Sequence, residues 1–299
     1  MDKILKFYNP LQYPGGMPGF NPSHPASKNI GFSLVPMGAS VVDLITCKKA
    51  NQVPGGNPTY QVLSGLGPSA QVLSNGTPEL WYAGGSFVSG KTAPFTLAAI
   101  VQFVAVGNLQ YFLHNDSRQA TTVNNGGRIG IYNATLQPNS FFLATANTVV
   151  DPNNANFVAV ANVPYFFAAS YNGTTANMVL ARLDNGRIFS QVVSSTLTVA
   201  ASDGGAGILN YGSDGTDGGS FGIDGSLAAA MCNYSYMSIP QLLVWASDPW
   251  SFWYPRAQQN LMFMGLQAPQ GAASPVVFRK TLSQIGGRVG SRQPQGWAA

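Results

Sequence analysis

The sequence has few charged residues and almost no glutamate. Only 9% of its 299 residues are charged, and the single glutamate is Glu79. Long surface helices need Glu, Lys and Arg on their solvent faces, so this composition argues against a helical protein. Glycine (34 residues) and proline (20 residues) instead punctuate the chain throughout. Short apolar runs between such turn residues predict an all-β protein.

Long apolar runs and cysteine are also scarce. No apolar run approaches about 18 residues, so we expect no membrane-spanning segment and no membrane partner. The first residues lack the apolar stretch and small-residue cleavage site of a secretion signal, so we expect none. Cys47 and Cys232 lie too far apart for a disulfide framework or a metal motif. We expect two buried thiols, with one long-range disulfide as the alternative.

The net charge of +4 belongs entirely to the end of the chain. Up to Arg256 there are 11 basic and 11 acidic residues, and the four remaining basic residues face no acid. Four charges spread over this segment are too sparse for a nucleic-acid partner. We therefore expect residues 257–299, which are rich in Gly, Pro and Gln, to form a basic arm that lies on an acidic neighbouring subunit.

The body of the protein is predicted to span residues 25–256, preceded by an extended arm over residues 1–24. Proline and glycine in this first segment leave no room for regular structure. Short apolar runs with turn residues between them predict strands at 30–35, 40–45, 60–63, 70–73, 79–82, 95–106, 111–114, 128–132, 140–145, 156–160, 165–171, 177–183, 187–193, 197–200 and 206–211. Such a series is typical of a jelly-roll sandwich of two antiparallel sheets.

The stretch 221–256 organises the rest of the prediction. Small apolar residues at 225–230, followed by alternation at 232–236, predict a strand through the middle of a sheet. Ser238 can then cap a short helix that Asp248 and Pro249 end. Trp250 and Trp253 follow, with two further aromatic residues beside them. We expect Asp248, Pro249, Trp250 and Trp253 to form a structural anchor that presses the end of the domain onto its core.

Five stretches resemble one known family when they are taken in order. They are SHPASKNIGFSLVP with SVVDLIT, PFTLAAIVQF, VPYFFAASYNGTTANMVLARLDNGR, and DGSLAAAMCNYSYMSIPQLLVWASDPWSFWYPR. The chain resembles the concanavalin A-like (laminin G-like) sandwich domains of tailed-phage and prophage proteins over residues 23–256. The His-Pro pair, the Asp-Leu pair and the closing Asp-Pro-Trp carry this likeness.

The resemblance implies a virion structural protein of a bacteriophage, assembled in the bacterial cytoplasm. It would be a capsid decoration subunit or a head–tail or tail-attached subunit, held by its arms to other virion proteins and to copies of itself. The alternative is a carbohydrate-binding adhesin of a tail or head fibre, which would recognise surface glycans of the host. In that case exposed aromatic residues at one rim, namely Trp81, Tyr82 and Tyr211, are the candidate sugar-binding residues. The competing interpretation is that they fill a core or an interface.

The sequence predicts no enzyme. A glycosidase needs two carboxylates that flank the scissile bond, and Glu79 has no acid within ten residues. The two histidines, His24 and His114, are expected to serve a structural hydrogen bond and a strand-end turn, respectively. No phosphate-binding glycine loop is present.

A glycine-rich loop at 203–225 carries three clustered aspartates. Asp214, Asp217 and Asp224 could coordinate calcium, since carboxylates and carbonyls on a loop suit a hard cation. The spacing does not match an EF-hand, which would end in a bidentate glutamate. The competing interpretation is that these aspartates form turns, and no other cofactor is expected.

Overall fold

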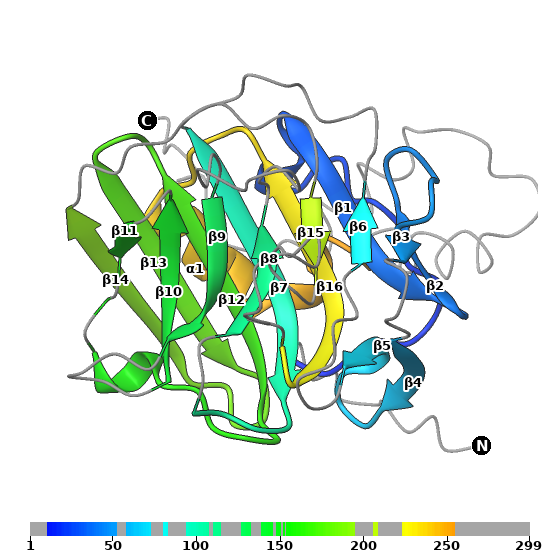
Figure 1. Cartoon of the computed structure of the whole chain (residues 1–299). Coiled ribbons are helices and arrows are strands. Elements are labelled where there is room, and N and C mark those ends of the chain that lie inside the picture. Colours follow the sequence, from blue (N-terminus) through cyan, green and yellow to red (C-terminus); the bar gives the residue numbers. More distant parts are fainter. Residues whose placement is uncertain are drawn as a thin grey trace, which may run out of the picture. The chain divides into compact units, whose positions relative to one another are not determined.

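The computed structural model of this chain describes residues 11–52, 58–72, 80–82, 94–107, 110–114, 127–132, 139–145, 148–150, 152, 154–194, 206–208 and 223–254. The chain divides into two compact units, Met1–Pro255 and Arg256–Ala299, and every described residue belongs to the first. The strands of this unit form two sheets (Figure 1). Within the described ranges, no helix is both long enough and apolar enough to cross a bilayer.

The larger sheet has nine strands, and its main path runs β14–β13–β12–β7–β16–β1–β2. A hairpin of β4 and β5 joins this path through β16. Its strands are β1 (Ile30–Met37), β2 (Ser40–Asp43), β4 (Thr59–Leu63), β5 (Gly67–Val72), β7 (Phe95–Phe103), β12 (Pro164–Tyr171), β13 (Thr175–Arg182), β14 (Ile188–Ser194) and β16 (Gly225–Asn233). The predicted hairpin of 165–171 and 177–183 is confirmed as β12 and β13, which pair from Tyr165 opposite Arg182 to Tyr171 opposite Ala176.

The smaller sheet has seven strands in the order β11–β10–β9–β8–β15–β6–β3. They are β3 (Asn51–Gln52), β6 (Leu80–Tyr82), β8 (Gln110–His114), β9 (Gly127–Tyr132), β10 (Ser140–Thr145), β11 (Thr148–Val150) and β15 (Ala206–Ile208). The pairings in both sheets are antiparallel. The structure therefore confirms the predicted antiparallel β-sandwich of jelly-roll type.

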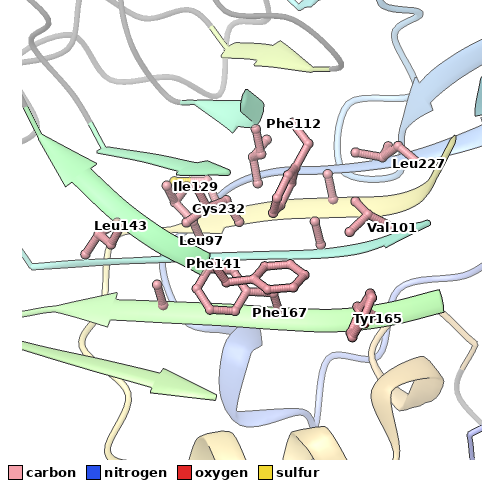
Figure 2. Close-up of a cluster of buried hydrophobic side chains, with 14 of the residues drawn as sticks. Leu97, Val101, Phe112, Ile129, Phe141, Leu143, Tyr165, Phe167, Leu227 and Cys232 are labelled. Carbon is pink, nitrogen blue, oxygen red and sulfur yellow. The ribbon is translucent and has the colours of Figure 1, made fainter. Parts of the chain in front are cut away.

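The space between the sheets is filled by an inner core of aromatic and aliphatic side chains. Phe141 of the smaller sheet lies 5.0 Å from Phe167 and 5.1 Å from Tyr165 of the larger sheet, measured between ring centroids. Figure 2 shows these rings beside Phe112, with Leu97 and Val101 of β7 lining the same space. These side chains have no exposed surface, so the inner core joins the two sheets into one body.

The central strands of the larger sheet are buried on both faces. Along β7, Leu97 and Val101 face the inner core, whereas Ala98 and Ile100 face a second, outer core. All nine residues of β16 are buried as well. This explains the continuous apolar runs that the sequence shows, because a strand covered on both faces has no solvent side to mark with polar residues.

The outer core is covered by helix α1 (Ile239–Ser247) and the 3-10 turn η3 (Pro249–Ser251). Ser238 stands at the helix start as predicted, and its backbone N–H donates to Oε1 of Gln241 at 2.9 Å. This bond satisfies a donor that the helix itself leaves unpaired. Leu242 and Trp245 point into the outer core, while Val244 on the opposite side of the helix is 67% exposed.

Two local predictions are wrong. The segment 156–160 was expected to be a strand, but it contains a 3-10 turn, η2 (Ala155–Phe157). The cause is Asn154, whose side-chain oxygen accepts a hydrogen bond from the Asn156 N–H at 2.9 Å and so caps the turn. Strands β3 and β11 were not predicted, because two or three residues are too few to show an alternating pattern.

The expectation for the cysteines holds for one residue and fails for the other. Both thiols are free, which excludes the alternative of a disulfide. Cys232 is buried in β16, whereas Cys47 is exposed, in a turn where its φ is +58°. The buried carboxylate of Asp43 accepts from the N–H groups of Ile45 and Thr46, at 3.2 and 3.1 Å, and folds this turn outward.

Candidate functional site

The anchor predicted at the end of the domain is present and buried. Trp245, Trp250, Phe252 and Trp253 each have at most 1% of their surface exposed. The Trp245 indole N–H donates to the Pro249 carbonyl at 3.1 Å, which ties η3 to the helix before it. The Asp248 N–H donates to the Trp245 carbonyl at 3.0 Å and ends the helix. Burial raises the pKa of the Asp248 carboxyl from 3.8 to about 6.

Residues 11–24, here called the N-terminal strap, lie on this anchor. The Gly19 N–H donates to the Trp253 carbonyl at 2.7 Å, and the Asn21 N–H donates to the Phe252 carbonyl at 3.1 Å. The Trp250 indole N–H in turn donates to the Leu11 carbonyl at 3.3 Å. As predicted, the strap contains no helix or strand, but it is attached along its length to its own sandwich.

Tyr13 fixes the first half of the strap. Its ring lies edge-on to Trp250 and Tyr254, with centroid distances of 5.4 and 5.1 Å. It also covers Gly67 of β5, where φ is +73° and a Cβ would overlap the tyrosine ring. Burial, together with the hydrogen bond that the Tyr254 hydroxyl makes to Tyr13, raises the pKa of Tyr254 above its usual range, so this hydroxyl stays neutral at physiological pH.

His24 fixes the second half and confirms the structural role expected for it. Its Nδ1 accepts from the Ala26 N–H at 3.1 Å and caps the 3-10 turn η1 (Pro25–Ser27). The ring stands edge-on to Trp245 at 4.9 Å and to Phe252 at 5.4 Å. Burial lowers the pKa of His24 from 6.5 to about 4, so the imidazole is neutral and already engaged at pH 7.

The strap brings the two ends of the described body together. Leu11 and Trp250 share a hydrogen bond, and Tyr13 and Tyr254 share a ring contact. The predicted arms, residues 1–24 and 257–299, are therefore revised in one respect, because residues 11–24 bind to their own domain. Aromatic residues within a segment rich in Gly and Pro were the sequence signal for this, since such residues seek a surface to cover.

The predicted sugar-binding residues Trp81 and Tyr82 belong to β6 of the smaller sheet. They are neighbours on one strand, so they occupy register positions of opposite phase and do not share a face. The third predicted residue, Tyr211, lies outside the described part of the chain. The sugar-binding role expected for these three residues therefore stays a prediction.

The register places Trp81 in a different row of residues. Trp81 pairs with Asn51 on one side and with Gly207 on the other; Gly207 pairs with His114, and His114 pairs with Arg128. Residues directly opposite one another in antiparallel strands share a face of the sheet. We call Asn51, Trp81, Gly207, His114 and Arg128 the outer row.

The phase of the outer row is set by its neighbours in sequence. Leu113, Ile129 and Leu143 are paired with one another across the same strands, and all three belong to the inner core. The outer row alternates with them and so takes the opposite register phase. His114 ends β8, as the predicted strand 111–114 requires, but the sequence alone could not show which strands it would join.

Of the three predicted calcium ligands, only Asp224 belongs to the described residues, so the calcium site stays a prediction. Asp214 and Asp217 lie outside the described residues, and Asp224 stands directly before β16. The Asp224 carbonyl accepts from the Val104 N–H at 2.7 Å, and its own N–H donates to Oε1 of Gln110 at 2.8 Å. Asp224 thus links the ends of three strands. No group of three or more His, Cys, Asp or Glu side chains suited to a metal occurs among the residues described.

No protein-family model matches this chain, and no curated protein matches it in sequence. Solved structures match at low similarity. One match is domain 4 of an extracellular arabinanase from Geobacillus stearothermophilus, solved in complex with arabinotriose. Its TM-score is 0.49 and its sequence identity is 10%, and the match covers 73% of this chain and 98% of that one.

Two further matches cover less of the other protein. The enzymatically active domain of tailspike protein 2 of bacteriophage CBA120 matches with a TM-score of 0.43 and 12% identity, over 64% of this chain and 29% of that chain. The binding domain of botulinum neurotoxin DC, in complex with SialylT, matches with a TM-score of 0.47 and 11% identity, over 73% of this chain and 50% of that one. At these identities, the ligands and reactions named for these proteins remain properties of those proteins.

Proposed function

We propose that this chain is a structural subunit of a bacteriophage virion, built on a lectin-like sandwich. It attaches to its neighbours in the particle through residues 1–10 and 257–299. A jelly-roll sandwich is a frequent scaffold of both viral capsid and lectin domains. We assign no reaction to the chain, and we propose its location in the virion together with its structural role.

One observation supports this attachment through the two terminal segments. The two ends of the described body, at Leu11 and Tyr254, are held side by side by the contacts of Tyr13 and Trp250. Two segments that start from one place can bind the same neighbour together, which raises their joint affinity through effective concentration. The net positive charge of the chain resides in the second of these segments. An acidic site on a neighbouring virion protein is the partner that this charge fits.

The test uses particles assembled with and without the last segment. Deletion of residues 257–299 is expected to leave a folded sandwich, because the anchor ends at Tyr254, and to reduce the number of subunits on purified particles at least about tenfold. The matched variant replaces Arg279, Lys280, Arg288 and Arg292 with Gln and keeps the length. Unchanged occupancy of the truncated protein would contradict the proposal.

The outer row favours a second candidate, a glycan-binding adhesin. It aligns an aromatic residue, an amide and two basic residue types across one face of the smaller sheet, with Gly207 between Trp81 and His114. Glycan sites in proteins combine aromatic residues with a few polar groups in this way. Binding on a glycan array, lost in Trp81→Ala and kept in Trp81→Phe, would support this candidate. Absence of any binding by the unmodified protein would contradict it.

A further inference from the structure

Strand β14 forms one end of the nine-stranded sheet (Figure 1). It pairs regularly with β13, from Thr175 opposite Ser194 to Ala181 opposite Ile188. On its other side, no strand and no backbone hydrogen bond reaches it from the rest of the described chain. Every other backbone N–H and C=O along such an edge points outward, so β14 offers a row of donors and acceptors.

At the opposite end of the same sheet, the edge of β2 is paired by the chain itself. Beside β2, the chain turns back on itself, and the Ala50 N–H donates to the Val41 carbonyl at 2.8 Å. The Asp43 N–H likewise donates to the Lys48 carbonyl at 2.9 Å, and Lys49 forms a bridge with Val42. Strand β4, a further edge, is a five-residue strand in a hairpin. Thus β2 is closed by its own chain, whereas no segment within the described ranges closes the seven residues of β14.

The composition of β14 contains none of the features that prevent edge pairing. Its sequence, IFSQVVS, has no charged residue and no proline, and its register with β13 shows no bulge. Edge strands that must remain single are commonly protected by lysine, proline or a bulge. Val192 on this strand is 54% exposed, although valine is usually buried. An unprotected edge with an exposed valine indicates a surface that is covered in the assembled protein.

We infer that β14 pairs with β14 of a second copy of this chain, antiparallel and about a two-fold axis at Gln191. In this register Phe189 stands opposite Val193 of the second copy, and Ser190 stands opposite its Val192. Phe189 and Val193 both pack at the margin of the inner core, so the pairing extends that core from one copy into the other. The arrangement is closed and isologous, because the same strand serves both copies.

The strand is complementary to itself in this register. No like charges meet, since the strand has no charged residue and the nearest one, Arg187, lies before it. Apolar residues meet on the inner side, and Ser190 covers the exposed Val192 on the outer side. The occupant that fits is therefore a second copy. Attachment of a different extended peptide to β14 is an outcome that the test separates.

The first experiment traps the axis with a disulfide in the full-length chain. Gln191→Cys is made in a Cys47→Ser background, since the exposed Cys47 would also react. Residues directly opposite in an antiparallel pair lie within the Cα separation that a disulfide needs. We expect a covalent dimer under mild oxidation. Val62→Cys in the same background is the control, because Val62 is 77% exposed on β4 of the same sheet. Equal cross-linking of the two variants, or none, would overturn the inference.

The second experiment uses charge. Gln191→Lys sets two lysines against each other at the axis, and we expect dimerisation, measured by sedimentation equilibrium, to weaken at least about tenfold. Gln191→Glu should do the same, and an equimolar mixture of both variants should recover a dimer. Val62→Lys should leave the dimer unchanged. A monomeric unmodified chain, or a dimer that Gln191→Lys does not weaken, would overturn the inference and leave a different partner for β14. Unchanged far-ultraviolet circular dichroism verifies that each variant is folded.

Discussion

The inner core is closed by strands from both sheets, whereas the outer core is closed by the two ends of the domain. Phe141 and Phe167 meet across the sheets without any polar group between them. On the other side of the larger sheet, the strap and the anchor meet through indole and amide hydrogen bonds and through ring contacts, including those of the His24 imidazole. The inner core therefore holds the sandwich together, and the outer core can open at the strap while the sheets remain paired.

The largest expected effect tests the inner core. Phe141→Ala removes a ring that contacts both sheets, and we expect the free energy of unfolding to fall by about 3–5 kcal/mol. The loss should appear in a single urea transition seen by both circular dichroism and tryptophan fluorescence. Val62→Ala, at a position 77% exposed, should change the unfolding free energy by less than about 0.5 kcal/mol. Equal effects of the two substitutions would contradict the division into a core and a surface.

The next effect is the pH dependence of the unfolding free energy, which tests two buried groups of the outer core. The pKa of His24 falls from 6.5 to about 4 on folding, so this group destabilises the fold as the pH falls through that range. The pKa of Asp248 rises from 3.8 to about 6, so this group stabilises the fold as the pH falls from about 6. Each effect reaches at most about 3 kcal/mol, and the two oppose each other.

The unmodified protein should therefore show little change in unfolding free energy between about pH 6 and pH 4. Asp248→Asn should leave the histidine effect alone and make the fold acid-sensitive, whereas His24→Gln should make the stability rise as the pH falls. Urea titrations at several pH values measure both slopes. Parallel pH profiles of the two variants would show that these groups do not titrate as the structure indicates.

The smallest effect isolates the strap. Gly67→Ala puts a Cβ against the Tyr13 ring at a residue with φ of +73°. Gly38→Ala is the matched control, because φ there is +60° but no atom lies within 4 Å of the added Cβ. We expect the backbone strain, about 1 kcal/mol, in both variants, and faster hydrogen exchange of residues 11–24 only in Gly67→Ala. Equal exchange in both variants would mean that Tyr13 does not hold the strap.

The sequence allowed much of this fold to be predicted, because the relevant patterns are local. Alternation and turn residues located β12 and β13, and Ser238 and Asp248 marked both ends of the helix. The candidate site was less accessible. Trp81 was chosen as an exposed aromatic residue, but its partners Gly207 and His114 come from strands distant in sequence. Only the register brings them together, and register between distant short strands leaves no trace in a single sequence. The contact of Tyr13 with Gly67 was hidden for the same reason.

The joining of residues 11–24 to Trp250 and Trp253 also sets the order of events during synthesis. The strap leaves the ribosome before its docking surface, which follows only after some 230 further residues, as the separation of Asn21 and Ser251 shows. Until the docking surface emerges, apolar side chains of the strap such as Tyr13 and Phe20 stay exposed on the nascent chain, and chaperones bind such side chains. Completion of this domain therefore coincides with emergence of its last tryptophans.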